Sequence, residues 1–181
     1  METKLPGVLL IEPDIHTDDR GYFLEAYNED KYCELLGADI VFVQDNQSRS
    51  RKGTLRGLHF QSKFPQGKLV RVTTGSVLDV VVDINPVSRT FKQWLSTQLD
   101  DTNHRQLYVP PGYAHGFCVT SDIADFQYKV TAFYHPEDEY SIIWNDPQLN
   151  IDWQIENPVV SAKDAKSPTL ADYLSGQRTA E

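Results

Sequence analysis

The sequence predicts a mostly β protein of the sandwich or jelly-roll kind, with a few short helices at its periphery. Short runs of alternating or β-branched residues recur through the middle of the chain, and each is bounded by Gly, Pro, Asn or Asp. Strands are expected at residues 68–74, 77–84, 93–99, 106–109, 116–120, 126–134 and 141–144. Many short strands at this spacing are typical of sandwiches and jelly rolls.

The run 77–84 shows the strand pattern most clearly. Every second residue from Leu78 to Ile84 is aliphatic, and the positions between them hold valines and the carboxylates Asp79 and Asp83. The pattern therefore predicts a strand with one apolar face and one mixed face.

Helix is expected only at the edges of this β framework. Residues 29–36 follow Asn28, a good N-cap, and end before Gly37, and a second short helix is expected at 170–174. Residues 1–181 are expected to form a single domain, and the last roughly six are expected to be disordered.

Composition excludes several classes of function. The formal net charge of −9 disfavours a nucleic-acid-binding protein, because binding to a phosphate backbone needs a broad basic surface. No apolar run approaches membrane-spanning length. Only two cysteines are present, Cys33 and Cys118, and the first residues lack an apolar targeting core, so a cytoplasmic location is expected.

Seven basic residues nevertheless lie within 23 positions of this acidic chain: Arg49, Arg51, Lys52, Arg56, Lys63, Lys68 and Arg71. Taken alone, such a run is most often a solvated basic face. It is also compatible with a site for one small anionic ligand, such as a nucleotide pyrophosphate.

The stretch from Gly53 to Lys68 combines glycines, apolar residues and an unusual density of polar groups. His59 is a candidate base, Arg56 is a fixed cation, and Lys68 is a second cation that could polarise an oxygen. Together these groups suit removal of a proton from a carbon next to a carbonyl.

Two segments resemble the double signature of cupins, small jelly-roll barrels that often bind a metal: residues 53–75 and 110–115. The positions where a metal cupin carries its ligands hold His59, Gln61, Gln66 and His115. Amide oxygens are weak neutral donors, so two imidazoles with two amides make a poor first shell for Zn, Fe or Mn. No metal or other cofactor is expected.

Eight motifs carry a closer resemblance, and together they run through most of the chain. They are residues 18–25, 43–48, 55–61, 66–70, 111–117, 128–129, 144–146 and 161–164. In this order they resemble the dTDP-4-dehydrorhamnose 3,5-epimerases, which are metal-free cupins. The resemblance implies a dTDP-4-dehydro-6-deoxy-D-glucose substrate, inverted at C3 and C5 through enolates to give dTDP-4-dehydro-L-rhamnose for dTDP-L-rhamnose biosynthesis.

The resemblance also implies four catalytic residues. His59 matches the base of the family, and Asp164 matches the carboxylate that orients it. Lys68 matches the group that stabilises the enolate oxygen O4. Tyr128 matches the acid that reprotonates the opposite face of the sugar. By contrast, His16, His104 and His135 are interpreted as structural histidines.

Ten further positions match family residues that bind the nucleotide sugar: Arg20, Glu25, Gln44, Asp45, Asn46, Arg56, His115, Tyr134, Glu139 and Lys163. Tyr134 matches a ring that stacks on thymine, and its separation of six residues from Tyr128 would place both on one face of an unbroken strand. Asp79 is the candidate for orienting His115. Glu139, taken alone, could also be an ordinary surface acid.

In such families the segment carrying Arg20 and Glu25 reaches into the site of a partner subunit, so a homodimer with exchanged residues is expected. Two other functions remain open. A related epimerase could invert only C3 or only C5 of another dTDP-4-keto-deoxysugar. A non-catalytic cupin that binds a sugar nucleotide would need neither a base nor an acid, so the set His59, Lys68 and Tyr128 speaks against it.

Overall fold

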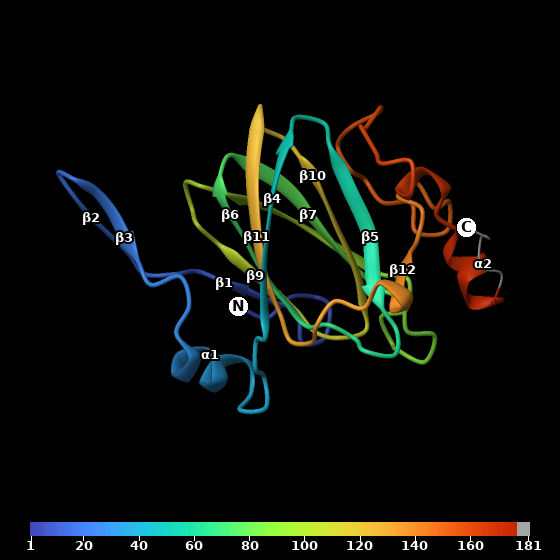
Figure 1. Ribbon diagram of the computed structural model, residues 1–181, viewed down its shortest axis with the longest axis horizontal. Coiled ribbons are helices and arrows are strands. Elements are labelled where there is room, and N and C mark those ends of the chain that lie inside the picture. Colours follow the sequence, from blue (N-terminus) through green and yellow to red (C-terminus); the bar gives the residue numbers. More distant parts are fainter. Residues whose placement is uncertain (177–181) are drawn as a thin grey trace.

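The computed structural model describes residues 1–176 and contains two five-stranded antiparallel sheets that pack against each other (Figure 1). Sheet 1 has the order β1 (Leu9–Ile11), β9 (Gln106–Val109), β6 (Lys68–Thr74), β11 (Ile123–Val130) and β4 (Gln44–Arg51). Sheet 2 has the order β12 (Glu139–Ser141), β5 (Leu55–Gln61), β10 (Tyr113–Val119), β7 (Ser76–Asp83) and β8 (Trp94–Asp100). This architecture confirms the predicted mostly β fold.

Both predicted helices form, each with a capping side chain. In α1 (Glu29–Leu36), the side-chain oxygen of Asn28 accepts a hydrogen bond from the amide of Lys31 at 3.3 Å. In α2 (Leu170–Leu174), Thr169 fills the same role. A side-chain acceptor at the N-cap satisfies an amide that has no partner within the helix, which is why these helices begin where the sequence predicts. The disorder predicted for the last six residues falls on Gly176 and on residues 177–181, and the latter lie outside the described residues.

Strand boundaries were predicted less well. The strand expected at 126–134 is β11 and ends at Val130, because the next residue, Thr131, exchanges hydrogen bonds with Gly67 on a neighbouring loop. The strand expected at 116–120 is β10, which starts at Tyr113. The strand expected at 141–144 was largely wrong, since β12 covers Glu139–Ser141 and residues 142–144 are not in a strand. β4 was missed, because its sequence QDNQSRSR has no apolar alternation.

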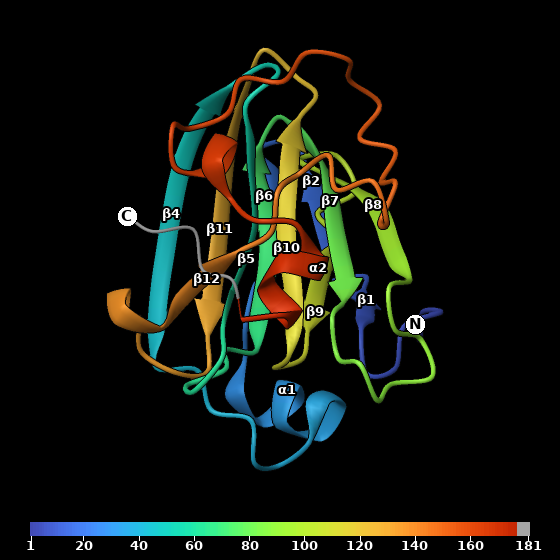
Figure 2. The same ribbon diagram turned by 90° about the vertical axis from the view of Figure 1, so that its right-hand side faces the viewer.

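The protein has one apolar core between the sheets, a second behind sheet 2, and a smaller cluster where Tyr32 of α1 packs against Leu69 and Tyr108 on the outer face of sheet 1. β7 contributes to the first two, with Val77 and Val81 in the first core and Val80 and Val82 in the second. This division confirms the two faces predicted for this strand. The C-terminal segment, including α2, crosses the outer face of sheet 2 and covers the second core (Figure 2).

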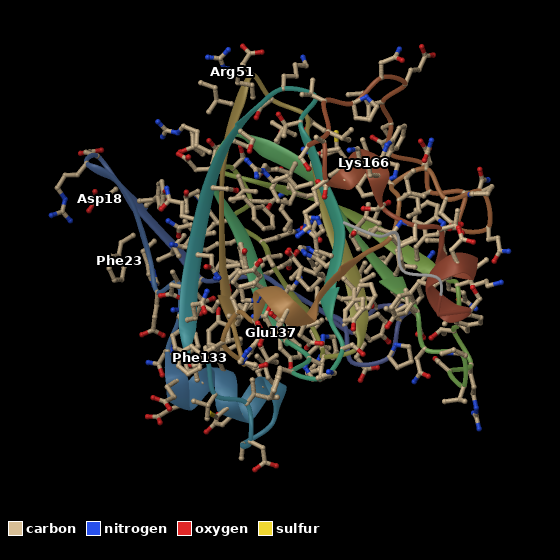
Figure 3. All side chains as sticks on the ribbon, turned by 45° about the vertical axis from the view of Figure 1, so that its right-hand side comes forward. Asp18, Phe23, Arg51, Phe133, Glu137 and Lys166 are labelled. Carbon is tan, nitrogen blue, oxygen red and sulfur yellow. The ribbon has the colours of Figure 1, made fainter. Side chains whose placement is uncertain are left out.

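A two-stranded hairpin, β2 (Ile15–Asp18) and β3 (Gly21–Leu24), projects from the body as an arm (Figure 1). Asp18 lies at its outer end (Figure 3). Tyr22 and Phe23 on this arm are 57% and 69% exposed. Within residues 1–176, no helix is long and apolar enough to cross a membrane.

A β-bulge in β5 sets which of its side chains face the first core. His115 and Phe117 of β10 are two residues apart, yet they pair with His59 and Arg56, which are three apart. The extra residue lies at Gly57, whose φ is +118° and where an added Cβ would lie 2.6 Å from the Cα of Gly116. Glycine permits this backbone conformation and close approach. The bulge therefore turns both Arg56 and His59 toward the interior.

Candidate active site

The centre of the candidate site is a histidine–carboxylate pair. His59 lies on β5, and its Nε2 is 2.7 Å from the Oδ1 of Asp164. Asp164 begins the short 3₁₀ turn η2 (Asp164–Lys166), and its own amide donates to Ser161 Oγ at 3.0 Å. Burial raises the pKa of Asp164, but the hydrogen bond and charge of His59, together with hydrogen bonds from Ser161 and the amide of Gly57, leave the pKa below its ordinary value. An ionised Asp164 accepts a hydrogen bond from Nε2–H, which leaves the lone pair of the ring on Nδ1.

A second pair lies next to it on sheet 2. His115 on β10 is paired in register with His59, so both rings face the interior. Its Nε2 lies 2.9 and 3.0 Å from the two carboxylate oxygens of Asp79, a fully buried residue of β7. The contact expected between Asp79 and His115 is therefore present.

Lys68 brings a positive charge into the same interior. It begins β6 on sheet 1 and is 9% exposed, and its Nζ donates to the main-chain carbonyl of His59 at 3.3 Å. Burial lowers its pKa to about 8, while the negative charges of Asp79 and Glu139 partly oppose this shift. An ammonium has three hydrogens, so Lys68 can still donate to an oxygen of a ligand.

Tyr128 faces this group from sheet 1. It is paired in register with Val70 of the first core, which places its side chain on the inner face of β11. Burial raises the pKa of its phenol, Glu139 raises it further, and Arg56 partly opposes the shift. Tyr128 therefore keeps its proton at neutral pH and can act as a donor.

Three predicted binding residues form a chain of polar contacts near Tyr128. Glu139 Oε2 accepts from the Tyr134 hydroxyl at 2.9 Å and also from the ammonium of Lys163. Burial raises the pKa of Glu139, but these two donors outweigh it, and the net pKa lies below the ordinary value. Glu139 is thus an ionised anchor that holds the Tyr134 ring and the Lys163 ammonium.

Two inward residues of β4 and one of β5 extend the polar lining. Gln44 Nε2 donates to Asn46 Oδ1 at 2.9 Å, and both residues pair in register with inward positions of β11. Arg56 Nε donates to Ser50 Oγ at 3.1 Å, which links β5 of sheet 2 to β4 of sheet 1. Ser50 was not predicted, since a lone serine beyond a motif gives no signal in the sequence.

Asp45 does not join these residues. It lies between Gln44 and Asn46 on β4, so its side chain points to the other face of sheet 1, where it pairs with Lys129 at 2.9 Å. There it borders an outer cavity of about 720 Å³. Within a single chain Asp45 therefore lies outside the inner lining, and its role in substrate binding stays a prediction.

The basic run also divides between the two faces. Arg49 bonds Asp125, and Arg71 bonds Gln127, both on the outer face of sheet 1. Of this run, Arg56 and Lys68 are the members whose register places them toward the interior. The run is thus neither one solvated face nor one anion site.

The placement of Tyr134 differs from the prediction. β11 ends at Val130, so Tyr134 lies beyond the strand in the following loop and not on an unbroken strand with Tyr128. Its amide donates to Gln44 Oε1 at 3.2 Å, and its ring is 47% exposed. The loop still brings Tyr134 to Glu139, by a route that side-chain periodicity could not reveal.

Arg20 and Glu25 lie apart from the other predicted residues. Arg20 is in the turn of the arm, where it pairs with Asp18. Glu25 pairs with Lys31 at 2.7 Å and borders the outer cavity. One chain alone therefore does not bring them to His59.

The amides at the remaining cupin ligand positions bind main-chain atoms. Gln61 Nε2 donates to the carbonyls of Phe64 and Phe133, and Gln66 Nε2 donates to that of Ala132. In the described part of the chain, no three His, Cys, Asp or Glu side chains gather as a metal site would require.

Comparisons with known proteins agree on one family. The sequence model described as dTDP-4-dehydrorhamnose 3,5-epimerase matches residues 2–172. The chain belongs to the dTDP-4-dehydrorhamnose 3,5-epimerase family. A relative of that name from Pseudomonas aeruginosa is 50% identical over 169 residues, which cover 93% of each chain. The family resemblance inferred from the eight motifs is thereby confirmed.

Solved structures show the same fold. The dTDP-6-deoxy-D-glucose-3,5-epimerase of Legionella pneumophila, in complex with dTDP-4-keto-L-rhamnose, matches with a TM-score of 0.94 and 48% identity, covering 100% of this chain and 98% of that one. A 3′-monoepimerase from Streptomyces bikiniensis, in complex with dTDP-quinovose, matches with a TM-score of 0.91 and 31% identity, covering 97% and 90%. The epimerase fold is therefore shared by enzymes with different outcomes.

Proposed function

We propose that this protein is the isomerase that converts dTDP-4-dehydro-6-deoxy-D-glucose into dTDP-4-dehydro-L-rhamnose by inverting C3 and C5. The observation that carries the proposal is the pairing of His59, on sheet 2, with Asp164 of η2, opposite a protonated Tyr128 on sheet 1. Inversion requires a base and an acid on opposite sides of the sugar ring, and two facing sheets supply them. Family membership supports the same substrate.

The C–H bonds at C3 and C5 both lie next to the C4 carbonyl. His59 Nδ1 removes one proton, and the electron pair moves onto O4 to form an enolate. The Asp164 carboxylate stabilises the imidazolium, and the Lys68 ammonium stabilises the enolate oxygen. Tyr128 then gives its proton to the other face of the same carbon. His59 then releases its proton to solvent and Tyr128 regains one from solvent, after which the same steps at the second carbon complete the double inversion.

The remaining predicted binding residues suit the nucleotide. Arg56 and Lys163 supply positive charge for the diphosphate. Tyr134, held by Glu139, supplies a ring for the thymine. His115, oriented by Asp79, supplies a fixed polar group beside the sugar. Gln44 and Asn46 supply side-chain amides that can form hydrogen bonds with the nucleotide.

A coupled assay tests this function. The purified protein is mixed with dTDP-4-dehydro-6-deoxy-D-glucose, a reductase specific for the L-sugar, and NADPH. We expect NADPH oxidation that depends on this protein, with dTDP-L-rhamnose as the product. A product inverted at one carbon would support a monoepimerase, and binding without any conversion would support a sugar-nucleotide-binding protein.

Tyr128→Phe separates the two halves of the reaction. The variant keeps the ring and loses the proton donor, so we expect His59 still to exchange the substrate proton with solvent. Inversion should fall by about 10²-fold or more, the usual contribution of a positioned acid. The measurement is deuterium incorporation against coupled product formation. Equal losses of exchange and inversion would contradict a role for Tyr128 that is limited to proton donation.

We also propose a cytoplasmic homodimer in which the arm of one chain completes the site of the other. The arm projects from the body with two exposed aromatic rings, and it carries Arg20, which is remote from His59 in its own chain. A second copy related by a two-fold axis could place Arg20 at the diphosphate of its partner. Glu25, which follows β3 at the base of the arm, would then also lie close to the partner's site.

Mixing two inactive variants tests this exchange. Arg20→Ala and His59→Ala are each expected to be nearly inactive. In a hybrid dimer, one site would contain both native residues, so random mixing should restore about a quarter of the wild-type sites. The activity of co-refolded mixtures gives the result. Activity no greater than the mean of the two separate variants would contradict the exchange.

A further inference from the structure

Two loops at one end of the sandwich are joined by buried side chains that the proposed chemistry does not use. One loop, residues 62–67, connects β5 to β6, and the other, residues 131–138, connects β11 to β12 through the 3₁₀ turn η1 (Pro136–Asp138). We call them the two rim loops. Phe133 and Glu137 mark the second of them in Figure 3.

Gln61 binds both rim loops at once. Its side chain is 4% exposed, and its Nε2 donates to the carbonyl of Phe64 at 2.8 Å and to that of Phe133 at 3.2 Å. Its Oε1 accepts from the amide of His135 at 2.8 Å. One buried amide therefore uses both hydrogens and its oxygen to hold three main-chain groups.

Asp138, on the second rim loop, binds main-chain amides of the first. It is 1% exposed, and its carboxylate accepts from the amides of Lys63 at 3.0 and 2.9 Å and Phe64 at 2.8 Å. Burial alone would raise its pKa, but these amide donors outweigh it, and the net pKa lies below the ordinary value. The second rim loop thus anchors the first through an ionised side chain.

The rim loops carry groups assigned to the nucleotide. Tyr134 lies between the two residues whose main chain Gln61 holds, Phe133 and His135. Glu139 directly follows Asp138 and pairs in register with Gln61. The positions of the Tyr134 ring and of the Glu139 carboxylate that binds it therefore depend on Gln61 and Asp138.

We propose that Gln61 and Asp138 are positioning residues for nucleotide recognition, which hold Tyr134 and Glu139 in place for the base end of the substrate. This inference rests on the proposed function. The catalytic pair of His59 and Asp164 is held by different contacts. The amide of Asp164 donates to Ser161 Oγ on the C-terminal segment, away from the rim loops. Loss of the loop contacts should therefore weaken nucleotide binding and leave proton transfer largely intact.

Two variants test the proposal. Gln61→Met keeps the length of the side chain and adds no charge, and Asp138→Asn removes one acceptor and the charge. The matched control is Asp83→Asn, a buried carboxylate that accepts from the amide of Asn85 and the Thr90 hydroxyl in the β7–β8 connection. For each protein we would measure the Kd for dTDP by calorimetry, the rate of solvent exchange at saturating substrate, and the Tm.

We expect both rim-loop variants to bind dTDP about tenfold more weakly, equivalent to about 1.4 kcal/mol, with an exchange rate within about twofold of the native protein. Asp83→Asn should lower the Tm and leave the Kd for dTDP unchanged. If Gln61→Met does not fold, Asp138→Asn decides alone.

An unchanged Kd in a folded rim-loop variant would overturn the inference and leave the proposed function standing. A lower exchange rate with an unchanged Kd would do the same. A similar loss of dTDP affinity in Asp83→Asn would also overturn it, since the effect would then be one of general stability. Failure of the native protein to bind dTDP would instead overturn the proposed function.

Discussion

His59→Ala is expected to abolish exchange of substrate protons with solvent at both C3 and C5. His59 is the proposed base, with its Nε2 held by Asp164, and the neighbouring imidazole of His115 is held by Asp79 through its own Nε2. A positioned general base contributes about 10²–10⁴-fold, and we expect a loss at the upper end because the same residue serves both carbons. The measurement is the NMR rate of deuterium incorporation.

Two comparisons make this result specific. The Kd of His59→Ala for dTDP should stay within a few-fold of the native value, because the nucleotide contacts lie elsewhere. Asp164→Asn should reduce exchange less than His59→Ala does, since it removes the orienting charge and keeps the base. Exchange in His59→Ala at the native rate would refute the assignment of the base.

Lys68→Met is expected to give the second largest loss, about 10²–10³-fold in the exchange rate, the usual effect of removing one group that stabilises an oxyanion. The same change should not destabilise the protein. Burial lowers the pKa of Lys68 from 10.5 to about 8, so at pH 7 the charged lysine costs the folded state about 3 kcal/mol. A neutral side chain of similar length removes this cost.

The measurements are the exchange rate and the Tm of Lys68→Met. Activity lost with an equal or higher Tm would identify a residue retained for chemistry and not for stability. The native enzyme should also slow as the pH rises through about 8, because Lys68 then loses its proton. Lys68→Met should lack this alkaline limb. A variant that keeps near-native exchange would contradict the role of Lys68.

The sequence predicted those parts of the fold that depend on local patterns. Strand β7 has a regular alternation, and α1 and α2 have capping residues, so their positions follow from propensity and periodicity. β4 has eight polar or small residues and no alternation of apolar groups, because its inner face lines a polar site and its outer face is also polar. Periodicity cannot detect such a strand.

Part of the candidate site could not be derived from spacing. Arg56 and His59 are three residues apart, which on a regular strand would place them on opposite faces. The bulge at Gly57 brings them to one face, and a bulge depends on pairing with Gly116, some sixty positions away. The density of polar groups in residues 53–68 grouped Arg56 with His59, but their spacing could not show that both face the interior.

For Asp45 and Tyr134, the family motif supplied the assignment and the structure placed the residue differently from what was expected. A motif match assigned Asp45 with its neighbours, but the alternation of β4 turns it outward to Lys129. The resemblance grouped Tyr134 with Glu139, which its hydroxyl contacts, whereas the strand argument offered for Tyr134 was wrong because β11 ends at Val130. Motifs report that residues belong to a family, and tertiary contacts decide which of them meet within one chain.

The measurement that tests the central claim most directly is an NMR time course with dTDP-4-dehydro-6-deoxy-D-glucose in deuterated buffer without added metal. One base and one acid that act in turn on both carbons next to C4 predict deuterium at C3 and at C5, with the L-sugar trapped by the reductase. Deuterium at one carbon only, or at neither, would contradict the double inversion.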